Sequence, residues 1–325
     1  MSKVSRPKII VVAGPTGTGK TDLAVRLAKR VSGVIINADS RQVYKGMGIG
    51  TNKGTLGKTG RSLMIAEKSI DEFEIDGSGV NGWLFDLVDP GENFSIADYQ
   101  QLTVGLITEL HSRGEVPILV GGSGLYIDIV LKGYALSGAP ANESLREALS
   151  KLSQTELFAM LGEVNPAKAD ALNNSDRNNP VRLIRAIEKM GVDAQDSSQK
   201  ELKSGYDAYM IYPEFDREEL YQRLNLRVDK MIAAGWVEEV KGLVERGLKD
   251  ARPLQGVGYG ELIAQLSGDL SLEEAVQKIK QGHRNYAARQ ITWFEGEGRG
   301  YYLHRYDFEK DGETITNDVR TFLIE

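Results

Sequence analysis

Residues 14–21 have the types and spacing of a phosphate-binding loop. Their order, Gly-Pro-Thr-Gly-Thr-Gly-Lys-Thr, fits the pattern G-x-x-x-x-G-K-S/T. The glycines allow tight bends that turn backbone N–H groups toward an anion. Lys20 adds a positive charge beside the outer phosphates, and the hydroxyl of Thr21 is a suitable ligand for a Mg²⁺ ion bound with them. The motif predicts binding of a phosphate ester and leaves open which ester binds and what reaction follows.

The segments on either side of this loop are those that such a loop requires. Residues 9–13 are apolar and mostly β-branched, which is typical of a buried parallel strand. Residues 20–31 place leucine, alanine and valine at helical spacing, so we expect a helix whose positive end points at the anion. Buried strands are also predicted over 33–37 and 116–120. Parallel strands place their carboxyl ends at one edge of a sheet, where ligands bind.

Two polar residues follow these further strands and would share that edge with the loop. Asp39 comes directly after 33–37, either as part of a ligand site or as a turn or helix-cap aspartate. Ser123 lies in the glycine-rich turn 121–124, which either lets the backbone approach a ligand or is a tight turn without one. Position alone leaves both alternatives open for each residue.

The composition is that of a soluble protein with a substantial core: 325 residues, 41% hydrophobic, with a net charge of −6. This charge gives no support for polyanion binding over the whole surface, although a local basic patch is compatible with it. The absence of cysteine excludes disulfides, zinc–cysteine sites and thiol catalysis. The polar N-terminus has no signal-peptide pattern, and no run approaches the roughly 20 apolar residues of a membrane span. We therefore expect a cytoplasmic protein without membrane contact. The sequence says little about oligomeric state, and a monomer is our working assumption.

Strand patterns disappear over 134–205, where helical patterns take over, and return at 208–212. We predict an α/β fold in which a P-loop NTPase-like parallel sheet flanked by helices is built from residues 1–133 and 206–325, with an all-helical insertion domain at 134–205. The other predicted elements are a mobile excursion with room for a hairpin at 52–82, strands at 83–88 and 301–306, and helices at 96–113, 145–152, 156–161, 167–172, 179–190, 271–293 and 314–323, with a further long helix capped by Asp216.

Two groups of basic residues have an open interpretation. Arg182, Arg185 and Lys189 fall on one stripe of a helix, which is either a solvated face or a contact for a nucleic-acid backbone. Arg223 and Arg227 lie one helical turn apart, where they could clamp a phosphate or pair with surface acids such as Glu219.

Several motifs occur in an order that resembles one enzyme family. They are the loop at 14–21, Asp-Ser-Arg-Gln-Val-Tyr-Lys-Gly-Met-Gly-Ile-Gly-Thr at 39–51, Gly-Gly-Ser-Gly-Leu-Tyr at 121–126, Pro-Val-Arg-Leu-Ile-Arg-Ala-Ile-Glu at 180–188, Gly-Val-Gly-Tyr at 256–259 and Arg-Gln-Ile-Thr-Trp-Phe at 289–294. Together they resemble the bacterial tRNA dimethylallyltransferases (tRNA isopentenyltransferases) over nearly the whole chain. The motifs at 39–51 and 289–294 are the most specific.

The resemblance implies transfer of a dimethylallyl group from dimethylallyl diphosphate to N6 of the adenosine directly 3′ of the anticodon in tRNA, with Mg²⁺ as cofactor. Diphosphate, the leaving group, would then occupy the loop. Catalysis is assigned to Asp39 as proton acceptor, with Thr18 and Lys20, and the metal to Thr21. The implied diphosphate-binding residues are Gly14, Pro15, Thr16, Gly17, Thr18, Gly19, Lys20, Thr21, Arg223 and Arg227. The implied tRNA-binding residues are Asp39, Ser40, Arg41, Gln42, Ser123, Arg146, Asn179, Pro180, Val181, Arg182, Leu183, Gln255, Gly256, Val257, Gly258, Tyr259 and Gly260.

The chain departs from the family pattern after Thr51. The family continues Ala-Lys-Pro and then has a short segment with histidine, whereas this chain reads Asn52-Lys53-Gly54 and its segment is longer. Gly82 to Asp86 stands where the family has His-Leu-Ile-Asp. The phosphate-binding loop is also compatible with three other functions: an ATP-dependent kinase, prenylation of free adenine nucleotides, and a nucleotide-binding switch. The basic insertion helix and the tRNA-contact motifs favour tRNA as the acceptor.

Overall fold

The computed structural model describes residues 6–133, 142–189, 205–296 and 300–325. The chain divides into two compact units, one formed by 1–133 with 202–325 and the other by 134–201. The predicted end of a helix at Met190 lies outside the described residues.

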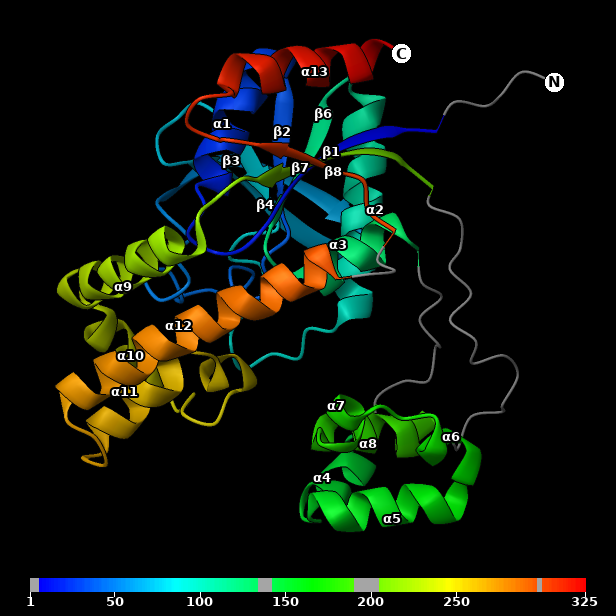
Figure 1. Cartoon of the computed structure of the whole chain (residues 1–325), viewed down its shortest axis with the longest axis vertical. Coiled ribbons are helices and arrows are strands. Elements are labelled where there is room, and N and C mark those ends of the chain that lie inside the picture. Colours follow the sequence, from blue (N-terminus) through cyan, green and yellow to red (C-terminus); the bar gives the residue numbers. More distant parts are fainter. Residues whose placement is uncertain (1–5, 134–141, 190–204, 297–299) are drawn as a thin grey trace. The chain divides into compact units, whose positions relative to one another are not determined.

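The larger unit is built on an eight-stranded sheet in the order β3-β4-β5-β2-β6-β1-β7-β8 (Figure 1). The parallel part, which confirms the predicted α/β fold, has β5, β2, β6, β1, β7 and β8 side by side. The bounds are β1 Lys8–Ala13, β2 Gly33–Asn37, β3 Leu56–Ile65, β4 Lys68–Ile75, β5 Asn81–Trp83, β6 Val116–Gly121, β7 Asp207–Pro213 and β8 Leu303–Tyr306.

The register of the central strands brings their carboxyl ends level. Ala13 at the end of β1 is opposite Gly121 of β6, and Asn37 at the end of β2 is opposite Val120. The loops that follow these strands therefore begin at the same edge of the sheet, as predicted.

Helices cover the sheet because their apolar stripes share its core. In α1, Lys20–Val31, the buried stripe includes Leu23 and Leu27, which join one core cluster with Ile10 and Ile118 of the sheet. The closing helix α13, Gly312–Ile324, joins the same cluster, and Figure 1 shows it beside α1. Helix α2, Ile96–Ser112, begins at the predicted capping box of Ser95 and packs with β6 and with α3, Gly124–Leu131.

The predicted strand at 83–88 is wrong. Strand β5 ends at Trp83, and Leu84 and Asp86 then have φ angles of 64° and 43°, in the left-handed region that an extended strand does not use. The segment is held by backbone hydrogen bonds to residues 42–45, such as the one from the Leu87 N–H to the Val43 carbonyl at 2.7 Å. Side chains add to this, because Asn37 Nδ2 donates to the Leu84 carbonyl at 3.0 Å and Lys53 pairs with Asp86. Its apolar side chains are buried without forming a strand.

The segment 52–82 is part of the sheet and not a separate excursion. Strands β3 and β4 form the antiparallel hairpin for which room was expected, and they extend the sheet at one edge. The residues of β3 are exposed or only half-buried, so the strand lacks the buried apolar run by which the central strands were predicted.

A layer of helices follows β7 in the same unit (Figure 1). Asp216 caps α9, Arg217–Ala233, and the capping box of Ser271 opens α12, Leu272–Glu295, as predicted. Helix α12 packs against α9, α11 and α3, so it reaches from the helical layer to the turn after β6. The other members of the layer are α10 Trp236–Glu245, the 3₁₀ helix η2 Arg252–Gln255 and α11 Tyr259–Leu266.

The smaller unit is helical throughout its described residues, and the four predicted helices are present. Its core is formed by Leu149, Leu157, Leu161, Ala169 and Leu183. The helices are α4 Glu143–Ser150, α5 Gln154–Val164, α6 Pro166–Asp170, α7 Asn174–Arg177 and α8 Pro180–Glu188, of which α7 was not predicted. Over the described parts of both units, every helix is too short or too polar to cross a membrane.

Candidate active site

The phosphate-binding loop joins β1 to α1, and its glycines have the backbone angles that only glycine adopts readily. The φ angles of Gly14, Gly17 and Gly19 are 135°, 91° and 76°. A Cβ on Gly14 would lie 2.6 Å from Pro213 Cδ, and one on Gly17 would lie 2.9 Å from Leu224 Cδ2. The loop is therefore packed closely against the end of β7 and against α9.

Lys20 is the first residue of α1, and its ammonium group curls back over the loop. Nζ donates to the Pro15 carbonyl at 2.7 Å, and Thr18 Oγ1 donates to the same oxygen at 2.9 Å. Burial lowers the pKa of Lys20 to about 7; nearby Asp39 opposes this shift, and the positive charge of Arg227 adds to it. Lys20, Asp39 and Arg227 are thus close enough to interact electrostatically.

The two arginines of α9 have different surroundings, although they lie one turn apart. Arg227 Nη1 donates to Thr16 Oγ1 at 2.9 Å, so this guanidinium adjoins the loop. Burial lowers the pKa of Arg227 to about 10, against the attraction of Asp39. Arg223 instead donates to Glu219 at 2.8 Å and Glu309 at 3.1 Å on the surface. The structure therefore places only Arg227 at the loop.

Asp39 follows β2 in a tight turn. Its own N–H donates to Asn37 Oδ1 at 2.9 Å, and its Oδ1 accepts from the Arg41 N–H at 2.8 Å. Asp39 is therefore a turn aspartate, as one of the two sequence interpretations proposed. Over the described residues, Oδ2 accepts no hydrogen bond, so the second oxygen is available to a ligand. The two interpretations are compatible, because each uses a different oxygen.

The turn at 121–124 is tight because protein, not ligand, lies against it. A Cβ on Gly121 would be 2.1 Å from the Ala38 carbonyl oxygen, and one on Gly124 would be 2.1 Å from Trp293 Cδ1. Ser123 Oγ accepts from the Ser40 N–H at 3.0 Å and so links this turn to the one that carries Asp39. The glycines are explained without a ligand.

Gln290 of α12 joins two of the site's loops and was not recognised as a candidate from the sequence. Its Oε1 accepts from the Thr16 N–H and its Nε2 donates to the Gly122 carbonyl, both at 2.9 Å. The side chain is buried on the apolar face that also carries Ala287 and Ile291. A polar residue on an apolar helical face was the signal that could have identified it, since buried amides need partners.

Glu239 of α10, also missed from the sequence, organises the motif at 39–51. Its carboxylate accepts from the N–H groups of Gly48, Ile49 and Gly50 at 2.8, 2.7 and 3.1 Å and from the Tyr259 hydroxyl at 2.7 Å. Tyr259, a candidate for tRNA contact, is consequently buried beside Trp236. The family motif at 256–259 thus has a structural function at Tyr259.

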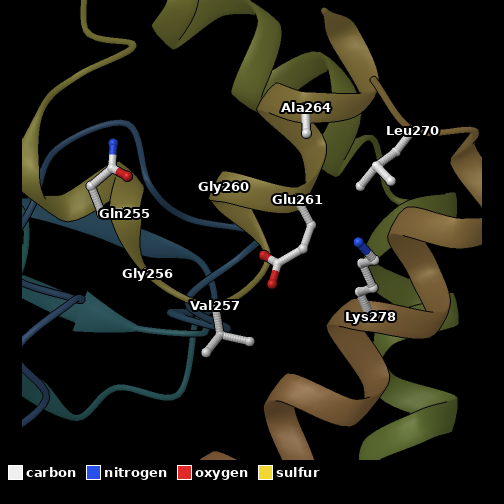
Figure 2. Close-up of a pocket in the computed structure, with 8 residues that line it drawn as sticks. All are labelled: Gln255, Gly256, Val257, Gly260, Glu261, Ala264, Leu270 and Lys278. Carbon is white, nitrogen blue, oxygen red and sulfur yellow. The ribbon is translucent and has the colours of Figure 1, made fainter. Parts of the chain in front are cut away.

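Gly258 is packed against Trp236, since a Cβ there would lie 2.0 Å from the indole ring. The other candidates of the stretch 255–260 border a hollow of about 390 Å³ between η2, α11 and α12 (Figure 2). Arg41 reaches this region, because its Nη1 donates to the Pro253 carbonyl at 3.0 Å. The other candidate of the first motif, Gln42, donates to the Thr51 carbonyl at 3.1 Å. The residues that line the hollow are Gln255, Gly256, Val257, Gly260, Glu261, Ala264, Leu270 and Lys278.

In the helical unit, Arg146 is used to neutralise a buried carboxylate. Its Nε and Nη2 donate to the two oxygens of Glu188, each at 2.9 Å, and Arg185 pairs with the same group. Burial alone would raise the pKa of Glu188, but the hydrogen bonds from Arg146, Arg185 and the Asn142 N–H lower it to about 2. This pairing fixes α4 to α8.

The candidates on α8 differ in their accessibility. Asn179 caps the helix by accepting from the Arg182 N–H at 3.2 Å, and Pro180 occupies its first turn. Val181 is 62% exposed, and the exposed Arg182 also pairs with Asp176. Leu183 is fully buried in the core, so its side chain cannot contact a nucleic acid.

The family model described as IPP transferase matches residues 42–297. The chain belongs to the IPP transferase family. It is 40% identical over 294 residues to the tRNA dimethylallyltransferase of Anoxybacillus flavithermus, covering 89% of this chain and 88% of that protein. It is 37% identical to the protein of the same name from Halalkalibacterium halodurans, covering 98% and 97%.

Solved structures agree with this assignment. The crystal structure of a tRNA isopentenylpyrophosphate transferase from Bacillus halodurans has a TM-score of 0.69 at 36% identity, covering 97% of this chain and 96% of that one. A eukaryotic dimethylallyltransferase acting on tRNA has a TM-score of 0.75 at 24% identity, covering 96% and 77%, and this likeness concerns the fold.

The donor set of this IPP transferase fits Mg²⁺ only in company with a phosphate. Over the described residues, no group of three or more His, Asp or Glu side chains could hold a metal without further ligands. The Thr21 hydroxyl, in the first turn of α1, is a hard oxygen ligand of the kind that Mg²⁺ shares with substrate phosphates. A Mg²⁺ site at Thr21 therefore requires the phosphate ester.

Proposed function

We propose that this protein transfers a dimethylallyl group from dimethylallyl diphosphate to N6 of the adenosine directly 3′ of the anticodon in tRNA and releases diphosphate. The main observation in support is the electrostatic grouping of Lys20, Arg227 and Asp39 around the loop after β1. Two cations and the loop's N–H groups suit an anionic leaving group, and the carboxylate suits a proton. The names of the relatives given above agree with this chemistry.

The bond changes follow from these roles. The N6 lone pair forms a bond to C1 of the dimethylallyl group as the bond between C1 and the diphosphate oxygen breaks. That electron pair leaves with the diphosphate, and a proton of N6 passes to Asp39 Oδ2, the oxygen that accepts no hydrogen bond over the described residues. Lys20 and Arg227 stabilise the negative charge that develops on the leaving group. Thr18 shares the Pro15 carbonyl with Lys20 and so helps to fix the loop.

Thr21, together with the diphosphate oxygens, would hold a Mg²⁺ ion. When bound, the ion supplies further neutralisation of the leaving group. Arg223 has a lesser part in this proposal, because Glu219 and Glu309 already pair with it.

For tRNA, the surfaces favoured by their accessibility are the hollow beside Gln255 and Val257 and the exposed residues Val181 and Arg182 of the helical unit. The target adenosine must leave its stack to present N6 to the site. With tRNA as its substrate, the protein would act in the cytoplasm, and we propose that it acts as a monomer.

The experiment that tests this function supplies dimethylallyl diphosphate, labelled in the dimethylallyl group, with unmodified tRNA, with AMP or with neither. Label is expected in tRNA alone, at the adenosine beside the anticodon after nuclease digestion. Transfer to AMP in preference to tRNA would replace the acceptor in this proposal. No transfer to either, with folded protein and Mg²⁺ present, would refute prenyl transfer.

A further inference from the structure

A histidine that no motif includes lies behind the arginine of the diphosphate site. His283 is in the middle of α12 and only 7% exposed. Arg227 Nη2 contacts His283 Nδ1 at 3.2 Å, while Nη1 of the same guanidinium donates to Thr16 Oγ1 at 2.9 Å. One guanidinium thus connects α12, α9 and the phosphate-binding loop.

The chemistry of the two groups fixes the direction of this hydrogen bond. An arginine has only N–H donors and keeps its charge in proteins, so Arg227 must donate. His283 Nδ1 must then be the acceptor, which requires a neutral imidazole with its proton on Nε2. Burial lowers the pKa of His283 to about 4, and the charge of Arg227 adds to the shift, so the ring is neutral at physiological pH.

The other groups around this contact do not compete for it. Trp236 of α10 meets the imidazole edge-on, with 6.1 Å between ring centroids, and carries no charge. One turn before, Lys280 pairs with Asp229, and the next residue, Arg284, donates to Asn225. Arg227 Nε is buried and has no hydrogen-bond partner over the described residues, so the protein uses only the two Nη groups of this guanidinium.

We infer that His283 is a positioning residue: by accepting a hydrogen bond at Nδ1, it holds the Arg227 guanidinium against the phosphate-binding loop, where it binds the diphosphate of the prenyl substrate. This inference rests on the proposed function, since it assigns His283 to the leaving-group end of that site. A free arginine side chain has many rotamers, and fixing it in advance reduces the entropy lost when the anion binds. Without the imidazole, Arg227 keeps its charge and loses its orientation.

The test measures binding of inorganic pyrophosphate with Mg²⁺ by titration calorimetry, using the full-length protein. His283→Leu removes the acceptor at similar size, and His283→Asn keeps an acceptor oxygen near the position of Nδ1. We expect about tenfold weaker binding for His283→Leu, the effect of about one hydrogen bond to a charged group, and near wild-type binding for His283→Asn. In the prenyl-transfer assay, His283→Leu is expected to raise the KM for dimethylallyl diphosphate and to leave the KM for tRNA unchanged.

A double substitution separates positioning from general damage. In an Arg227→Ala background, His283→Leu should weaken pyrophosphate binding no further, because the group that it positions is gone. Full additivity would overturn the inference, as would unchanged binding by a folded His283→Leu protein. If His283→Leu does not fold, His283→Ala takes its place in the same cycle. Wild-type protein that binds no pyrophosphate would instead refute the proposed function itself.

Discussion

Replacing Lys20 by methionine is expected to stabilise the ligand-free protein while abolishing its affinity for diphosphate. The ammonium lies among backbone and side-chain atoms of the loop, with another cation, Arg227, nearby. The site therefore holds a charge that only a bound anion fully compensates. Methionine has a similar length and no charge, so Lys20→Met removes the electrostatic penalty and also the function.

The magnitude and its pH dependence follow from the pKa. Lowering the pKa of Lys20 from 10.5 to about 7 corresponds to about 5 kcal/mol against the charged form, at about 1.4 kcal/mol for each pKa unit. Because Lys20 is half-buried and the substitution also loses the hydrogen bond to Pro15, we expect a net gain of about 1–3 kcal/mol at pH 6. Below pH 7 the folded protein carries the charge and the full penalty. Between pH 7 and 10.5 the folded protein releases this proton while the unfolded chain keeps it, so the penalty disappears as pH rises.

The assay is thermal unfolding of wild type and Lys20→Met at pH 6 and pH 9, without ligand and with excess pyrophosphate and Mg²⁺. The variant should unfold at a higher temperature at pH 6, and its advantage should shrink at pH 9. Pyrophosphate should raise the midpoint of the wild type alone. Lys20→Arg is the matched control. Arginine stays charged at both pH values, so the Lys20→Arg protein should not gain the stability that the wild type gains between pH 6 and pH 9. If the variant is less stable than wild type at pH 6, or if its advantage does not change with pH, the charge of Lys20 does not destabilise the folded protein and the reasoning is refuted.

Three further substitutions test other parts of the structure. Asp39→Asn should reduce single-turnover prenyl transfer at least a hundredfold while pyrophosphate binding by calorimetry survives; equal loss of both would remove Asp39 as the proton acceptor. Glu239→Gln should lower the unfolding free energy by about 2 kcal/mol and raise the KM for tRNA, because the N–H groups of Gly48 to Gly50 lose a charged acceptor; unchanged denaturant midpoints would contradict this. Glu188→Gln should destabilise the helical unit by about 2 kcal/mol above pH 4.5, and this difference should vanish as pH falls toward 2. The measurement is hydrogen exchange of the amides of α4 and α8. Equal exchange in wild type and variant at pH 7 would argue against a stabilising ion pair.

The sequence predicted the buried central strands of the sheet and did not locate the exposed edge strand β3. Strands β1, β2 and β6 are continuous apolar runs between glycine-rich turns, and each was located within a residue or two. Strand β3 lies at the edge and has mostly exposed residues, so it has no such pattern. The opposite error occurs at 83–88, where an apolar run predicts a strand that is not formed. The side chains there are buried, but the backbone has left-handed φ angles at Leu84 and Asp86.

The candidate site shows the same division between local and long-range information. Residues 14–21 and Asp39 could be identified because a local motif fixes both their conformation and their place at the edge of the sheet. Gln290, Glu239 and His283 come from distant helices, and only tertiary packing brings them to the loops that they support. Helical spacing also made Arg223 and Arg227 equivalent, and what separates them is the position of α9 relative to the loop.

The arrangement explains why a small anion-binding loop needs so much of the chain. Lys20 and Arg227 both have a lowered pKa, because burial at the loop disfavours their charged forms. Such cations keep their positions only if surrounding structure holds them, and here Pro15, Thr16 and His283 provide the contacts. A ligand that brings several negative charges relieves this strain, and one that brings a single charge relieves it only partly. Under the proposed function, these electrostatics would favour diphosphate, in the prenyl substrate and in the product, over a monophosphate ester of the same alcohol.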